Sequence, residues 1–146
     1  MEGKTVGMAS DHAGYAMKEY LKGVLEGLGY KVRDFGAYSE ERADYPDSAH
    51  PLATAVEAGE VGFGVAVCGS GNGICMTLNK HQGIRAALCW APELGRLAKA
   101  HNDANVLCLP GRFVSEDEAK AILEAYLGAE FEGGRHSIRI SKIPCR

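Results

Sequence analysis

The chain has 146 residues, which is about the size of one ordinary domain. Its composition is 46% hydrophobic and 24% charged, which is typical of globular proteins and argues against disorder. Sixteen basic and nineteen acidic side chains leave a formal charge of −3, so charge gives no reason to expect nucleic acid or an anionic membrane as a partner. No apolar run approaches the roughly 18 residues of a membrane-spanning helix, and we expect no secretory signal at the N-terminus.

The cysteines argue against a disulfide framework and against a common structural zinc site. Their number is odd and no two of them form a C-x-x-C pair. Two of them, Cys89 and Cys108, lie within apolar runs and are expected to be small core residues. Reduced thiols in a chain without a signal predict a cytoplasmic protein.

Short apolar runs alternate along the chain with segments of helical periodicity. The runs predict strands over residues 5–9, 31–34, 61–67, 84–88 and 105–109. Three of these runs are nearly continuous in apolar residues, as expected for strands of a parallel sheet covered on both faces. The intervening segments predict helices over residues 15–28, 51–58, 70–79 and 91–101. Gly29 stands where a helix would end, and Ser115 with Glu118 forms a capping box that opens one more helix.

This alternation predicts an α/β fold with an open five-stranded parallel sheet and helices on both faces. We find no internal repeat, low-complexity tract or linker, so residues 1–146 are expected to form one domain. The segment 133–146 differs because it is the most basic part of an otherwise acidic chain. Composition alone would be equally consistent with a solvated terminus.

Ligands of open α/β sheets bind at the carboxyl ends of the strands. This rule directs attention to the loops at residues 10–14, 68–73 and 110–112, and to the segment 101–105 that ends the helix after the fourth strand. We expect these four segments, which are far apart in the sequence, to meet along one edge of the sheet.

The loop after the third strand is the most informative of the four. Gly69, Gly71 and Gly73 let the backbone approach a ligand closely, and the next helix directs free N–H groups toward it. Such a loop suits a phosphate or an oxyanion formed during a reaction. It is not a Walker loop, because no Lys-Ser/Thr pair follows it. It is not a dinucleotide fingerprint either, because its spacing is Gly-x-Gly-x-Gly and it follows the third strand instead of the first. Taken alone, the glycines would be equally consistent with a tight turn.

Cys68 makes the loop a stronger candidate for chemistry. It stands just before the loop, where helix N-terminal N–H groups can stabilise a thiolate that acts as nucleophile or general base. His12 and His101 lie in polar segments and are candidates for acid–base chemistry or anion binding, whereas His50 and His81 are expected at the surface. Forked donors suited to phosphate are available at Arg112, Arg135 and Arg139.

Together these motifs closely resemble the type B ribose-5-phosphate isomerases, a family that includes the subunits of galactose-6-phosphate isomerase. The matching segments are residues 10–14 (SDHAG), 44–47 (DYPD), 68–74 (CGSGNGI), 83–86 (GIRA), 101–106 (HNDANV) and 133–136 (GGRH). They occur in the family's order and nearly span the chain, and the ordered set is far more specific than any one of its members.

The resemblance implies a Rossmann-like three-layer sandwich that forms a homodimer or a tetramer, with active sites shared between subunits. The implied reaction is the aldose–ketose isomerisation of ribose 5-phosphate and ribulose 5-phosphate through an enediolate, without metal or cofactor. Cys68 would be the base that moves a proton between C1 and C2. His101, with Asp11 nearby, would open the furanose ring. The enediolate oxygen would be held by Ser70 and by the loop amides of Gly69, Gly71, Asn72 and Gly73.

The remaining site residues implied by the resemblance bind the substrate. Phosphate would be bound by His12 and Arg112 of one subunit and by Arg135, His136 and Arg139 of the other, so that segment 133–146 would reach the partner. Tyr45 and Asn102 would contact sugar hydroxyls. One subgroup of the family has a glutamate base at the position of Ile74, and this chain therefore resembles the cysteine type.

Three alternatives remain open at this stage. An isomerase for a hexose 6-phosphate, such as allose or galactose 6-phosphate, would use the same residues in a longer pocket. A non-catalytic sugar-phosphate-binding protein would not need Cys68, Ser70 and His101. An NAD-dependent reductase would need glycine spacing in the first turn and an acidic residue after the second strand, where the chain offers only Asp34.

Overall fold

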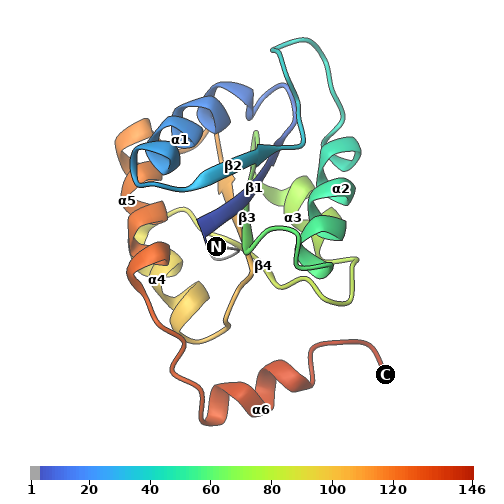
Figure 1. Ribbon diagram of the computed structural model, residues 1–146, viewed down its shortest axis with the longest axis vertical. Helices are drawn as coiled ribbons and strands as arrows, with labels where there is room; N and C mark the ends of the chain where they lie inside the picture. Colours follow the sequence, from blue (N-terminus) through green and yellow to red (C-terminus); the bar gives the residue numbers. More distant parts are fainter. Residues whose placement is uncertain (1–3) are drawn as a thin grey trace.

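A computed structural model describes residues 4–146 as a five-stranded parallel sheet between two helical layers (Figure 1). The sheet has the order β2-β1-β3-β5-β4. Its strands are β1 (Thr5–Ser10), β2 (Lys31–Asp34), β3 (Phe63–Cys68), β4 (Ala86–Leu88) and β5 (Val106–Pro110). The helices are α1 (Tyr15–Gly27), α2 (Tyr45–Glu57), α3 (Asn72–Leu78), α4 (Pro92–Ala100), α5 (Glu116–Gly128) and α6 (Arg135–Ser141). All five predicted strands and the predicted fold class are confirmed.

The register of the sheet brings the carboxyl ends of its central strands together. Ser10 at the end of β1 pairs with Val67, and Cys68 at the end of β3 pairs with Pro110. Strand β4 starts later than predicted, because the amide of Arg85 bonds to the side chain of Asn105 (2.7 Å) instead of joining the ladder. The loops that follow β1, β3 and β5 therefore share one edge of the sheet.

One face of the sheet is covered by α1, α4 and α5, through large aliphatic side chains. Leu21 and Leu25 of α1 and Ile122 and Leu123 of α5 are fully buried against this face. The strands direct alternate residues such as Val65 to it, as the two-residue period of a strand requires.

The opposite face is built from much smaller side chains and is covered by α2 and α3. Ala9, Ala66 and Cys108 are buried on this face. Leu52 of α2 lies so close to the sheet that a methyl group on Gly64 would come within 3.1 Å of it. Small residues on the strands thus let α2 approach the sheet closely.

The helix ends follow the predicted signals at two places and depart from them at one. Gly29 follows α1 with φ at +94°. The capping box at the start of α5 is complete: the Ser115 hydroxyl accepts the amide of Glu118 (3.1 Å), and the Glu118 carboxylate accepts the amide of Ser115 (2.8 Å). The prediction that the second helix starts at Pro51 is wrong, because α2 begins at Tyr45 with Pro46 in its first turn. Pro51 lies inside this helix, at the cost of one main-chain hydrogen bond.

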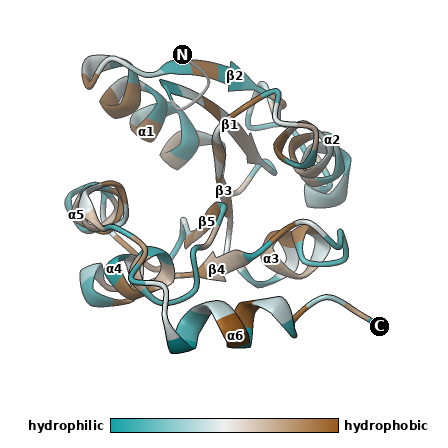
Figure 2. Cartoon of the chain, turned by 60° about the horizontal axis from the view of Figure 1, so that its bottom comes forward, coloured by the Kyte–Doolittle hydropathy of each residue, from teal (hydrophilic) through white to brown (hydrophobic). Residues whose placement is uncertain are grey.

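The basic C-terminal segment forms the short helix α6, which sequence periodicity does not predict. Figure 2 shows α6 crossing beneath α4, β4 and α3, outside the two helical layers. The segment is tied at both ends, by the amide of Glu132 to the carbonyl of Ala100 (2.9 Å) and by the amide of Cys145 to Gln82 (3.1 Å). Ile138 of α6 is 62% exposed. No helix of the described residues has the length and apolar character needed to cross a membrane.

Candidate active site

The carboxyl edge of the sheet gathers the predicted residues that follow β1, β3 and β5. Cys68 ends β3 and is 4% exposed. The loop after β5 is bonded to the loop after β3, since the amide of Gly111 donates to Cys68 (2.9 Å) and that of Arg112 donates to Gly69 (3.0 Å). Asp11 follows β1, and its carboxylate accepts the amide of Gly14 at the start of α1 (2.9 Å).

The glycine loop between β3 and α3 presents backbone amides at this edge. Gly71 adopts φ +79°, and the first hydrogen bond of the helix runs from the amide of Cys75 to Gly71 (3.2 Å). The amides at residues 72–74 precede that bond and have no helical partner. One of them, Asn72, donates to the hydroxyl of Ser70 (3.2 Å). The loop thus combines amide donors with the Cys68 thiol in six residues, as predicted.

Two larger side chains lie directly against the glycine loop. A methyl group on Gly73 would come within 2.6 Å of the Tyr45 ring, and one on Gly69 would come within 3.3 Å of the Arg112 guanidinium. Tyr45 reaches the loop from the start of α2, and Arg112 reaches it from the end of β5. The close approach explains why these two positions are glycine. It also places a cation and a phenol beside the backbone of the glycine loop.

His12 is held by the loop that connects β2 to α2. Its Nδ1 lies 3.1 Å from the carbonyl and 3.2 Å from the amide of Ala43. That loop is fixed in turn by Lys18, whose ammonium donates to Asp34 (2.7 Å) and to the carbonyl of Ala37 (2.6 Å). Lys18 is fully buried, and the sequence analysis did not identify it. The available signal was a lysine on the same face of α1 as the core residue Leu21, at helical spacing.

A second group of predicted residues lies at the opposite edge of the sheet. His101 ends α4, and its ring stacks on that of His136 with centroids 4.2 Å apart and 16° between the planes. Both Nε2 atoms face one carboxylate oxygen of Glu132, at 3.6 and 3.7 Å. Burial, assisted by the neighbouring His101, lowers the pKa of His136 from its ordinary value. The other members of the group are Asn102, Arg135 and Arg139.

The expectation that segment 101–105 meets the loops after β1, β3 and β5 along one edge of the sheet is therefore wrong within one chain. Helix α4 follows β4 and runs back across the sheet, so its end lies next to the start of β5. Cys68 and His101 are separated by about the length of a strand, on the order of 15 Å. The rule for α/β sheets applies to segments that follow strands, whereas residues 101–105 precede one.

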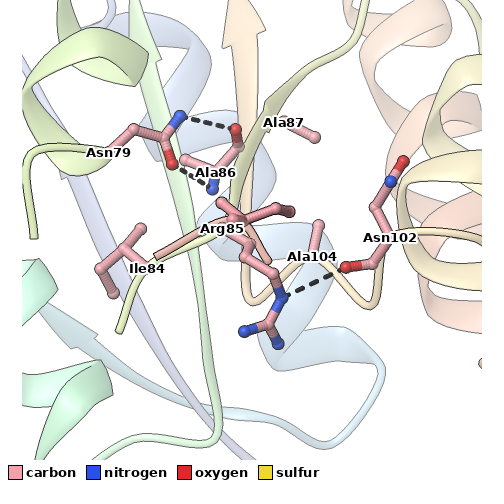
Figure 3. A pocket seen from close by; sticks show the side chains of 8 residues that line it. Asn79, Ile84, Arg85, Ala86, Ala87, Asn102 and Ala104 are labelled. Atoms are coloured by element: carbon pink, nitrogen blue, oxygen red, sulfur yellow. Dashed lines mark hydrogen bonds between the residues drawn. The ribbon is translucent and has the colours of Figure 1, made fainter. Parts of the chain in front are cut away.

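The edge strand β4 borders a pocket of about 300 Å³ (Figure 3). Asn79 closes one side with two hydrogen bonds to Ala86 (2.8 and 2.9 Å), and Arg85 donates to the carbonyl of Asn102 (3.2 Å). Ile143 from the C-terminal segment completes the lining. Asn102 is the one predicted site residue that lines it, so this pocket is separate from the carboxyl edge.

The remaining cysteines differ from Cys68 in their surroundings. Burial raises the pKa of Cys89 to about 12 and that of Cys108 well above its ordinary value. Both are buried in the core, as predicted. Ile74 of α3 is fully buried between α3 and the sheet, in the layer that α2 and α3 form. Cys68 is therefore the thiol that stands at the amide-rich loop.

Comparison with known proteins matches nearly the whole chain. A family described as Ribose/Galactose Isomerase matches residues 6–143. Ribose-5-phosphate isomerase B of Escherichia coli is 43% identical over 140 residues, which cover 96% of this chain and 94% of that protein. A Clostridium thermocellum ribose-5-phosphate isomerase B structure is 45% identical with a TM-score of 0.94, covering 95% of this chain and 94% of that one.

A third relative is similar in sequence and contains a ligand. The structure of ribose-5-phosphate isomerase B from Mycoplasma genitalium, with bound ribulose 5-phosphate, is 40% identical with a TM-score of 0.90. The match covers 95% of this chain and 93% of that one. With this coverage, identity and shared fold, the chain belongs to the ribose/galactose isomerase family.

Proposed function

We propose that this protein interconverts ribose 5-phosphate and ribulose 5-phosphate, with Cys68 as the base. The observation that carries the proposal is the position of the thiol at the end of β3, followed directly by the glycine loop and by the first amides of α3, which have no partner within the helix. Proton abstraction next to a carbonyl needs a base near the carbon and donors near the oxygen, and this loop supplies both. The relative from Mycoplasma genitalium binds ribulose 5-phosphate, the ketose of this pair.

In the proposed reaction, the Cys68 thiolate removes the proton from C2 of the open-chain aldose. The electron pair of that C–H bond forms the C1–C2 double bond of the enediolate, and negative charge collects on O1. The amides of residues 69–73 and the hydroxyl of Ser70 stabilise this charge. The thiol then returns its proton to C1 while a proton moves from O2 to O1, which gives the ketose without any net redox change.

We propose that each active site combines the two edges of the sheet from two chains. Cys68, Asp11, His12, Tyr45 and Arg112 lie at the carboxyl edge of one chain. The opposite edge of the partner would supply His101 to open the furanose ring and Asn102 to contact a hydroxyl. Arg135, His136 and Arg139 of the partner would then bind the phosphate together with His12 and Arg112. The separation of the two groups within one chain, together with the exposed Ile138 on α6, supports this arrangement.

The base is tested by Cys68→Ala, assayed for turnover with ribose 5-phosphate. We expect turnover to fall at least about 10²-fold, the usual contribution of a positioned base, while substrate binding and unfolding stay near wild type. The matched control is Cys145→Ser, which removes an exposed thiol near the C-terminus and should retain full activity. A Cys68→Ala protein that keeps most of its turnover would exclude the thiol as base.

The shared site is tested by mixing two inactive variants, Cys68→Ala and His101→Ala. If each site takes Cys68 from one chain and His101 from the other, a mixed dimer holds one intact site. Random exchange should then restore about one quarter of wild-type activity, because half of the dimers are mixed and half of their sites are intact. Absence of recovery after verified subunit exchange would show that both residues act within one chain.

The preferred chain length of the substrate is tested separately. Allose 6-phosphate and galactose 6-phosphate would need the same base in a longer pocket. The family name covers a pentose, ribose, and a hexose, galactose. We expect kcat/KM to be highest for ribose 5-phosphate in side-by-side assays. A higher value for a hexose 6-phosphate would leave the mechanism unchanged and replace the substrate.

A further inference from the structure

His101, Glu132 and His136 form a cluster of three side chains that can each ligate a metal ion. One ligand atom from each residue lies within 4.8 Å of the other two. The two distances to the Glu132 oxygen, 3.6 and 3.7 Å, are close to the spacing of about 3.3–3.5 Å between ligands of a tetrahedral zinc ion. His101 is 34% and Glu132 50% exposed, so the His101 ring can rotate out of its stack with His136 and direct its Nε2 toward the other two ligand atoms. Two histidines and a glutamate are also a common ligand set for zinc with one open position.

The state of His136 gives independent support for a ligand at this place. Its side chain is 8% exposed, and its Nε2 has no hydrogen-bond partner among the described residues. Leaving a buried polar atom without a partner is costly, and a bound ion would give this nitrogen a partner.

The charges around the cluster decide which class of cation it can hold. Arg135 and Arg139 lie on α6 with His136, so the surroundings of the cluster are positively charged and repel cations. Mg²⁺ and Ca²⁺ depend on negative oxygen ligands, of which the cluster has one carboxylate. Zn²⁺ binds imidazole nitrogen well and therefore depends less on charge.

We infer that His101, Glu132 and His136 bind one Zn²⁺ ion per chain, and that this ion inhibits the protein instead of serving as its cofactor. Binding would occupy the Nε2 lone pair of His101, which ring opening needs, and would draw His136 away from the phosphate. The inhibition rests on the proposed function, whereas the binding of the ion does not. Glu132 is the member of the site to which the reaction gives no role.

Binding is tested by calorimetric titration of the whole protein with Zn²⁺ in the absence of substrate. We expect one ion per chain, and Glu132→Gln and His136→Asn should each weaken binding at least about tenfold. Glu132→Gln is the main variant, because its side chain is half exposed and the fold should tolerate the change. The matched control is His81→Gln, which removes one ring of another exposed histidine pair, in which His50 Nδ1 lies 2.7 Å from His81 Nε2. This change should leave Zn²⁺ binding unchanged.

Cobalt substitution separates this site from the thiols. Co²⁺ bound by nitrogen and oxygen gives visible bands without the thiolate charge-transfer band in the near ultraviolet, so the expected spectrum lacks that band and is lost in Glu132→Gln. A thiolate band, or binding that falls in His81→Gln and not in Glu132→Gln, would overturn the assignment.

Inhibition is tested with the same variants in the isomerase assay. Zn²⁺ should inhibit the wild-type protein reversibly, and adding a chelator should restore its turnover. Half-inhibition of Glu132→Gln should need at least about tenfold more Zn²⁺. Without metal, the turnover of this variant should stay near that of the wild-type protein. Equal sensitivity of the two proteins would overturn the inhibitory role. A protein without any turnover would refute the proposed function while the calorimetric result would still decide the metal site.

Discussion

Lys18 offers the sharpest test of how the fold holds the loop that positions His12. Its ammonium is fully buried and donates to the carboxylate of Asp34 (2.7 Å) and to the carbonyl of Ala37 (2.6 Å). Lys18→Met keeps the length of the side chain but leaves both acceptors without this donor. Breaking a buried ion pair by removing one partner costs about 3–5 kcal/mol. Asp34 keeps the amide of Gly36 (2.8 Å) and the ammonium of Lys22 (3.6 Å), so we expect the lower end, about 3 kcal/mol.

Urea unfolding followed by circular dichroism at fixed protein concentration measures this loss. The midpoint should fall with an unchanged slope, and Tm should fall by about 6–12 °C for a chain of this size. Lys22→Met is the matched control, since its ammonium lies 3.6 Å from the same carboxylate but is 32% exposed. We expect that control to lose less than about 1 kcal/mol. Equal losses in the two variants, or a loss below about 1 kcal/mol in Lys18→Met, would refute the argument from burial.

Three further changes test other parts of the fold. Tyr126→Phe removes a buried 2.6 Å hydrogen bond to a backbone carbonyl, and urea unfolding should show a loss of about 1–2 kcal/mol; unchanged stability would contradict this reading. Gly14→Ala would place a methyl group 2.6 Å from a backbone carbon of β3, and we expect it to lower the free energy of unfolding by about 3 kcal/mol. Gly23→Ala in α1 places its methyl group in open space and should raise the free energy of unfolding by about 0.5–1 kcal/mol. The opposite order of stabilities would contradict this reading of the two sites. Hydrogen bonds from Ser115 hold the pKa of Glu118 below its ordinary 4.5, so its carboxylate stabilises the fold above that pH and ceases to do so as the pH falls through the lowered pKa. In Glu118→Gln, the free energy of unfolding should therefore fall less steeply with decreasing pH below about 4.5 than in the wild-type protein. Identical pH dependence in the two proteins would show that the Glu118 carboxylate does not contribute.

The sheet could be predicted from the sequence because its signals are local. A run such as residues 105–109 is apolar throughout, and a strand buried on both faces requires this. The capping box at Ser115 and Glu118 likewise lies within four residues, so sequence spacing determines it. The start of α2 was less accessible, because Pro46 and Pro51 are both acceptable helix-starting residues and only the first has that role.

In the candidate site too, the features fixed by neighbouring residues could be predicted from the sequence, whereas those fixed by long-range packing could not. Cys68 and the glycine loop are adjacent in sequence, and their arrangement follows from a strand that leads into a helix. The place of His101 depends on the direction in which α4 crosses the sheet, which no nearby residue encodes. The approach of Glu132 to two histidines depends on where α6 packs, and that short helix has no periodic signal of its own. Lys18 was missed because its partners become neighbours only in the folded chain.

The small side chains on the α2 face of the sheet link the protein interior to the position of Tyr45 beside the glycine loop. Helix α2 rests on Ala66 and its neighbours, and the same helix begins at Tyr45, whose ring lies against Gly73. A larger residue at Ala66 would push the helix outward and carry the phenol away from the loop. Relatives that accept longer sugars could therefore gain space through changes in the interior alone. A survey restricted to the residues that touch the sugar would miss the origin of such a difference in specificity.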